Sequence, residues 1–285
     1  MNASIPNETQ YNYHDPYNLT AGISISVLGT FGITCNATLI YIYCTNRSER
    51  NSFNTICNMR AAVNLYILTV LFAIVFLPTT LLGYTPIFST PVSACLIASG
   101  NGLYAMNENL TLLSAINRCC AIFLPLRYTR LCGMKPTVCL VCLLVYRIGK
   151  LINEMRLSLF TDRECWLYFS PNKLVWKVTK GEGCTMYDDA IPPFVVIFIF
   201  TTSLNAVTFL KIICFYRKKS QLDKTSRSRE RKNIRLFFQT VLQDLIYLVD
   251  LTFTFKLSGL VAHRLWSLLS GTLIWESLHS FDGYN

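Results

Sequence analysis

Charged residues are scarce in this sequence. Aspartate, glutamate, lysine and arginine make up only 15% of its 285 residues, whereas 52% are hydrophobic, and the mean hydropathy is +0.37. Soluble globular domains usually carry about 25% charged residues. The composition therefore argues against a water-soluble domain and favours an integral membrane protein.

Residues that build metal and catalytic sites are few or dispersed. The three histidines, His14, His263 and His279, stand far apart, whereas a zinc site needs clustered ligands. Walker, zincin and nucleophile-elbow patterns are absent. Residues 100–105 fit a dinucleotide-binding pattern by letters alone, but they lie in an apolar segment with no preceding strand. We expect no metal, no cofactor and no enzymatic activity.

Long apolar runs, in contrast, are abundant. A hydrocarbon core about 30 Å thick requires roughly 20 helical residues, and seven runs approach or exceed this length. We therefore expect an all-α membrane protein built as a bundle of seven transmembrane helices. The expected spans are 21–44, 55–82, 91–122, 136–152, 192–215, 234–255 and 265–281.

Two of these spans carry weaker signals than the others. The fourth contains Arg147 and Lys150, which would have to extend to the lipid headgroups, and the seventh is short. The expected organisation is an N-terminal arm over 1–20, the bundle over 21–281, and terminal residues 282–285 with no cytoplasmic tail. The arm lacks the features of a cleaved signal, so we expect the first helix to direct membrane insertion.

The distribution of positive charge predicts the orientation. Lys and Arg residues concentrate in the loop that contains Arg47, the loop that contains Arg127, and above all the run 217–235 with its nine basic side chains. Because Lys and Arg are retained in the cytoplasm, these loops are expected inside. An odd number of spans then leaves the N-terminus outside.

The N-terminal arm also contains glycosylation signals. Asn2, Asn7 and Asn18 each begin an Asn-x-Ser/Thr sequence, which is the acceptor of N-linked sugars in extracellular segments. Chance occurrence of such short patterns is the alternative. Glycosylation would agree with an outside N-terminus, independently of the charge argument.

The basic run 217–235 admits two interpretations. In a soluble protein it could bind nucleic acid, but here it joins two membrane spans. We therefore expect it to set the topology and to attract anionic membrane lipids, and we expect no nucleic-acid partner.

Arg118 is followed by a distinctive pattern. Taken alone it would be another inner-surface charge, but it is followed at fixed offsets by Ala121, Ile122, Pro125, Leu126 and Tyr128. This resembles the end of the third helix and the second inner loop of rhodopsin-like G-protein-coupled receptors, where Asp/Glu-Arg-Tyr precedes Ala-Ile and Pro-Leu-x-Tyr. Here Asn117 stands in place of the acid and Cys119 in place of the aromatic residue.

This resemblance implies a set of coupling residues. Arg118 would turn toward the inner ends of the fifth and sixth helices and become available to a heterotrimeric G protein when they separate. Without a carboxylate at position 117, the arginine lacks one partner of the resting state, so the basal equilibrium would shift. The implied coupling surface consists of Asn117, Arg118, Pro125, Tyr128, Arg231 and Lys232.

Three stretches make the resemblance specific to one family of such receptors. "LTLLSAINRCCAIFLPLRY", "IRLFFQTVLQDLIYLVDL" and "LWSLLSGTLIWESLHSFDG" together are similar to the nematode serpentine chemoreceptors of class X, over nearly the whole chain. The implied role is detection of an extracellular small-molecule or peptide cue at the plasma membrane, in the cilia of sensory neurons. The family would continue its seventh helix further, whereas this chain stops at Asn285.

The resemblance also implies a disulfide bond. Only Cys95, Cys165 and Cys184 fall on the expected outer side, where oxidation is permitted. Receptors of this kind join the start of the third helix to the loop before the fifth, which corresponds to Cys95–Cys184. Cys95–Cys165 stays open as the alternative.

Polar side chains within the spans suggest a ligand site. Asn101 and Glu108 lie within about 20° of each other on the third helix, and Gln243 and Asp250 share a face of the sixth. Such groups avoid lipid and should face the bundle interior, where they contact a ligand or form hydrogen bonds between helices.

A small transporter or channel is the alternative from a different class. Glu108 and Asp250 would then line a conduction path. Transporters usually contain internal repeats or broken helices at matching positions, and we find no repeat. The sequence therefore favours the receptor.

Overall fold

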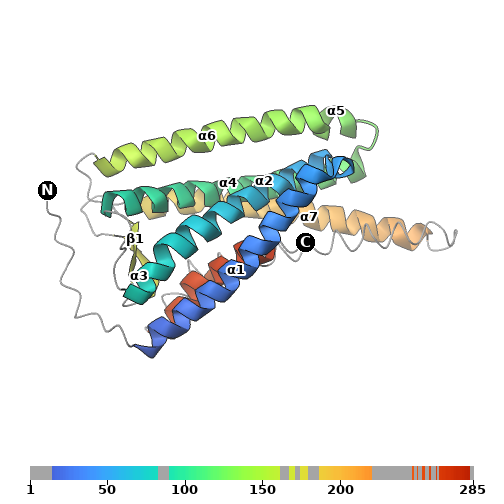
Figure 1. Cartoon of the computed structure of the whole chain (residues 1–285). Coiled ribbons are helices and arrows are strands. Elements are labelled where there is room, and N and C mark those ends of the chain that lie inside the picture. The colour runs from blue at the N-terminus through green and yellow to red at the C-terminus, as the bar shows by residue number, and fades with distance from the viewer. Residues whose placement is uncertain are drawn as a thin grey trace.

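The computed structural model is a bundle of long helices with one short β-hairpin (Figure 1). The residues that it describes are 15–82, 90–160, 167–170, 174–178, 186–219, 246, 249, 252, 253, 257, 261 and 263–282.

The first and last described helices lie side by side. α1 (Pro16–Thr45) begins where the Asp15 side chain accepts a hydrogen bond from the Tyr17 N–H, 2.9 Å away, directly before Pro16. An acidic N-cap followed by proline is a favoured helix start. The chain is again continuously helical from α9 (Arg264–Leu268) through the π-helical η4 (Leu269–Leu273) to α10 (Ile274–Asp282), and this red helix runs along α1 in Figure 1.

The second span is one continuous helix with a wider middle part. It comprises α2 (Ser52–Tyr66), the π-helical η2 (Ile67–Phe76) and α3 (Leu77–Leu82), after a short 3₁₀ turn η1 (Arg47–Glu49). The wide turns end just before Pro78. Proline lacks the N–H of a regular helical bond, so a local change of helix type is expected there.

α4 (Thr90–Phe123) is the central helix and lies against α2, α6 and α7 (Figure 1). The short α5 (Tyr128–Cys132) connects it to α6 (Met134–Phe160). α7 (Met186–Lys219) contains Pro192 and Pro193, and its last turns extend past the bundle.

A β-hairpin lies at one end of the bundle. β1 (Leu167–Ser170) pairs antiparallel with β2 (Val175–Val178), in a register that places Leu167 opposite Val178 and Ser170 opposite Val175. We call this end of the bundle, where α1 and α4 begin, the hairpin end, and the opposite end, where α4 ends, the Arg118 end (Figure 1).

The described helices have the apolar surfaces of membrane spans. Four segments are long and apolar enough to cross a membrane: Pro16–Thr45, Ser52–Leu82, Tyr128–Asn153 and Pro192–Cys214. Only 22% of the most apolar stretch of the first and 17% of that of the last are buried, so most of their apolar side chains face outward, where lipid would lie. α4 is not among the four, because asparagines and Glu108 interrupt its sequence.

The helix bounds agree with most of the expected segments, and beyond the four segments named above the crossing of a membrane stays a prediction. The helices of the first, second, third and seventh spans agree with the expected limits within a few residues. The fourth expected span, 136–152, lies within α6, which continues eight residues past 152 to Phe160. The expected sixth span, 234–255, lies almost entirely outside the described residues, and the hairpin was not expected at all.

Candidate functional site

The residues at the Arg118 end form a connected polar group. Asn117 is buried in α4 and accepts a hydrogen bond from the Tyr128 hydroxyl, 3.0 Å away. The same hydroxyl lies 3.0 Å from Ser52 Oγ at the start of α2. Asn117 and Tyr128, two expected coupling residues, are thus in direct contact and tie α4, α5 and α2 together.

Arg118 follows on the next position of α4 and is half-buried. Its Nε donates to the carbonyl oxygen of Ser114, 3.3 Å away, one turn earlier. Pro125 is exposed in the turn between α4 and α5. α7 contacts α4 at this end of the bundle. Lys211 Nζ lies 5.5 Å from the centre of the Phe123 ring, in the geometry of a cation–π contact.

A buried ion pair links α2 to α10 in the interior. Arg60 Nη2 donates to Asp282 Oδ1 over 2.6 Å, and the two side chains are only 5% and 6% exposed. Asn64 Nδ2 donates to the other carboxylate oxygen, also over 2.6 Å. From α4, Asn107 Oδ1 accepts from Arg60 Nε at 3.3 Å. Both charges are therefore paired and additionally hydrogen-bonded, as burial in a membrane protein requires.

His279 extends this polar network along α10. Its Nδ1 lies 2.7 Å from Asn64 Oδ1, which also accepts from Asn107 Nδ2 at 2.9 Å. Because an amide oxygen only accepts, His279 Nδ1 must carry the proton. Asn36 of α1 donates to the His279 carbonyl oxygen at 3.1 Å. We call the six residues Asn36, Arg60, Asn64, Asn107, His279 and Asp282 the interior polar network.

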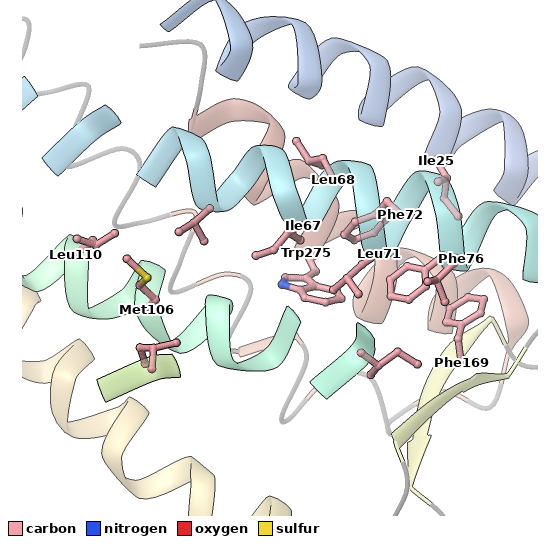
Figure 2. Close-up of a cluster of buried hydrophobic side chains, with 14 of the residues drawn as sticks. Ile25, Ile67, Leu68, Leu71, Phe72, Phe76, Met106, Leu110, Phe169 and Trp275 are labelled. Atoms are coloured by element: carbon pink, nitrogen blue, oxygen red, sulfur yellow. The ribbon is translucent and has the colours of Figure 1, made fainter. Parts of the chain in front are cut away.

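An aromatic cluster lies next to this network, toward the hairpin end (Figure 2). The Trp275 ring is 5.8 Å from that of His279 and 5.2 Å from that of Phe72. Phe76 stacks on Phe169 of β1, with ring centres 5.1 Å apart and planes inclined by 14°. The hairpin is thus part of the same packed interior.

A clamp at the hairpin end joins the beginning of α1 to the beginning of α9. The Arg264 guanidinium donates to the Asp15 carboxylate and, over 2.6 Å, to Asn18 Oδ1. Partial burial alone would raise the pKa of Asp15, but the hydrogen bond from the Tyr17 N–H and the charge and hydrogen bond of Arg264 lower it below its ordinary value of 3.8.

The structure describes one of the three expected glycosylation sites. Asn18 lies in the first turn of α1, is 3% exposed and binds Arg264. Glycosylation at Asn18 stays a prediction. Asn2 and Asn7 lie outside the described residues.

The expected disulfide involves cysteines of which the structure describes only one. Cys95 is a half-buried free thiol on α4, and its two expected partners, Cys184 and Cys165, lie outside the described residues. The pairing stays a prediction.

The structure describes only two of the four expected ligand residues. Glu108 is buried in α4 with 4% exposure, and Asn101 is half-buried two turns earlier. Gln243 and Asp250, like the expected coupling residues Arg231 and Lys232, lie outside the described residues. Their role in binding a ligand therefore stays a prediction.

The residues of the interior polar network were missed by sequence reasoning. The signal was present, since each of these residues except Asp282, which follows the last expected span directly, lies inside an expected span. Asn107 directly precedes Glu108 on the third span, and the polar residues of the first, second and seventh spans entered no expectation. Glu276 is a further such residue: it is fully buried, and neither carboxylate oxygen has a hydrogen bond to any described residue.

The fold and site define a helical, multi-pass membrane protein whose interior carries a paired charge network. The sequence matches the family model of the serpentine type 7TM GPCR chemoreceptors, Srx, over residues 26–284. The chain therefore belongs to this family of seven-transmembrane receptors, which is a chemoreceptor family and not an enzyme family. No curated protein matches the sequence.

Proposed function

We propose that this protein is a chemosensory receptor that crosses the plasma membrane seven times with its N-terminus and hairpin end outside. It binds an extracellular small-molecule or peptide cue and signals through a heterotrimeric G protein at the Arg118 end. The membership of the Srx family over residues 26–284 carries this proposal. The basic residues at the Arg118 end, which suit the cytoplasm, support the orientation.

The contacts at the Arg118 end suggest how the signal is produced. In the described arrangement Lys211 of α7 lies over Phe123 of α4, and Asn117 is tied to Tyr128. A ligand that favours a separation of α7 from α4 would break the first contact and expose the neighbouring Arg118. The G protein would bind this exposed arginine and thereby stabilise the same arrangement.

The continuous packing from the hairpin end to the interior polar network supports this proposal. Phe169 of the hairpin stacks on Phe76, Trp275 lies between the aromatic cluster and His279, and His279 is bonded to Asn64 of the interior polar network. A displacement at the hairpin end would therefore act on groups that pack directly against one another.

The test is a G-protein activation assay in a heterologous cell with Arg118→Ala. We expect the ligand-evoked signal to be lost while the amount of receptor at the cell surface is unchanged. Arg47→Ala is the matched control, since Arg47 is an exposed arginine of the loop after α1. A full signal from the Arg118 variant, or an equal loss in the Arg47 variant, would contradict the proposed role. An epitope at residue 1 that antibodies reach only in permeabilised cells would contradict the orientation.

A further inference from the structure

The segment that joins α4 to α6 carries an uncompensated positive charge. Between Glu108 and Glu154 the chain contains no aspartate or glutamate, whereas three basic residues stand close together at Arg127, Arg130 and Lys135. All three side chains are exposed, and none forms an ion pair with a described residue. We call these three residues the α5 basic patch.

The neighbouring loop does not supply a counter-ion. α5 lies against the start of α2, because the Tyr128 hydroxyl is 3.0 Å from Ser52 Oγ. The loop before α2 contains one acidic residue, Glu49, and its carboxylate accepts a hydrogen bond from Asn54 Nδ2 over 2.8 Å. Among the described residues, the α5 basic patch is therefore without an acidic counterpart.

The exposed face of α5 combines basic and apolar side chains. At about 100° per residue, Leu131 lies between Arg127 and Arg130 around the helix, whereas Cys132 is buried on another side. Leu131 is 47% exposed, and Leu126 in the preceding turn is 97% exposed. A single exposed leucine needs no explanation, but leucines interleaved with arginines are typical of segments that lie in the interface of a membrane.

The position of α5 suits contact with lipid headgroups. α4 ends at Phe123, and the apolar segment Tyr128–Asn153 begins with α5. Figure 1 shows α5 at the Arg118 end, beside the start of α6. In the proposed orientation this end faces the cytoplasm, where the inner leaflet is rich in anionic lipids that attract basic side chains.

We propose that Arg127, Arg130 and Lys135 bind the headgroup of an inner-leaflet lipid that carries several phosphate groups, as phosphoinositides do. The two guanidinium groups donate paired hydrogen bonds to phosphate oxygens, and the Lys135 ammonium adds a third positive charge. Leu126 and Leu131 enter the boundary of the acyl chains. This inference rests on the orientation in the proposed function, and its partner is a lipid and not the G protein.

The fixed position of α5 distinguishes this site from a general attraction to negative charge. Tyr128 is bonded to Asn117 and contacts Ser52, and Cys132, one turn later, is buried. α5 cannot turn about its axis without losing these contacts. Its two arginines are thus held on one side before a lipid binds, which lowers the cost of ordering them. A headgroup with several phosphates can contact both, whereas one with a single phosphate cannot do so equally well.

The test counts the lipids that the full-length receptor, purified in detergent, retains in native mass spectrometry. Phosphatidylinositol bisphosphate, phosphatidylserine and phosphatidylcholine are offered at equal concentrations, and the first should be retained preferentially. Arg127→Gln and Arg130→Gln should each lower its affinity about fivefold, the scale of one basic residue at a lipid surface. Arg47→Gln is the matched control, because it removes an exposed arginine of the loop after α1, and it should leave the affinity unchanged.

A second comparison separates a lipid from a soluble phosphate compound. Inositol trisphosphate has a similar headgroup without acyl chains, and it should displace the lipid only weakly. Leu131→Ala should weaken the binding of the lipid and leave that of inositol trisphosphate unchanged. Equal affinities for the two compounds, with no effect of Leu131→Ala, would identify a soluble ligand and overturn the lipid assignment.

Two further results would overturn the proposal. Equal losses in Arg47→Gln and the α5 variants, or equal retention of phosphatidylserine, would show a general attraction to negative charge. Unchanged lipid binding with a lost G-protein signal in the α5 variants would make α5 a surface for protein docking. Binding in detergent requires no G protein, so the expected lipid pattern in a receptor that gives no signal would contradict the proposed coupling alone.

Discussion

The guanidinium of Arg60 donates to the carboxylate of Asp282 over 2.6 Å, although 222 positions separate the two residues in the chain. The contact joins the second expected span to the end of the seventh. Each charge would be very costly in a membrane interior by itself. As a pair they require α2 and α10 to lie side by side.

Loss of one partner of this pair should destabilise the receptor strongly. Arg60→Ala leaves the Asp282 carboxylate buried without its counter-ion, and we expect a loss of about 3–5 kcal/mol of stability. Thermal unfolding of the detergent-purified receptor, together with its amount at the cell surface, measures this loss. The exchanged pair Arg60→Asp with Asp282→Arg should recover part of the stability. A single variant as stable as the exposed control Arg47→Ala would show that the pair contributes nothing.

The helical framework was largely predictable because apolar length is a strong signal. The second span illustrates this: the expected segment 55–82 and the observed helix Ser52–Leu82 end at the same residue. The end of the fourth helix was less predictable, since α6 continues past Lys150 through a segment in which Asn153, Glu154 and Arg156 stand among apolar residues. A helix can extend beyond the hydrocarbon core, so hydropathy alone does not mark its end.

The interior contacts were not predictable to the same degree. Angles along one helix relate residues such as Asn101 and Glu108, but they do not identify the partner on another helix. The bonds from Asn64 to Asp282 and to Asn36 depend on how three helices pack. The hairpin was missed because its two strands are only four residues long and their pairing depends on Phe169 and Leu174 packing against helices distant in sequence.

The clamp at the hairpin end should respond to acid. The lowered pKa of Asp15 means that the folded protein binds its proton less readily than the unfolded chain does. The stability from this group is therefore fully present above the ordinary pKa of 3.8 and is lost as the pH falls through the lowered, folded value.

The size of this acid effect should be modest. The Asp15 and Arg264 side chains are 20% and 28% exposed, and ion pairs screened by solvent contribute no more than about 1 kcal/mol. Thermal unfolding between neutral pH and pH values below 3.8 should show a steeper loss in the wild type than in Asp15→Asn. Because other groups titrate in both proteins, only the difference between the two curves is informative. Parallel curves would mean that the clamp contributes no pH-dependent stability.

The close approach of α1 to α10 predicts opposite effects for two glycines. A Cβ at Gly32 would lie 2.7 Å from Ser280 Cα, a backbone atom that cannot move away by rotation of a side chain. Gly32→Ala must therefore push the two helices apart, at a cost of about 1–3 kcal/mol. A Cβ at Gly149 in α6 would meet nothing within 4 Å, and alanine is a better helix former than glycine by about 1 kcal/mol. Gly149→Ala should consequently be neutral or stabilising in the same thermal unfolding assay. If Gly32→Ala is as stable as Gly149→Ala, α1 and α10 do not approach each other as closely as the structure indicates.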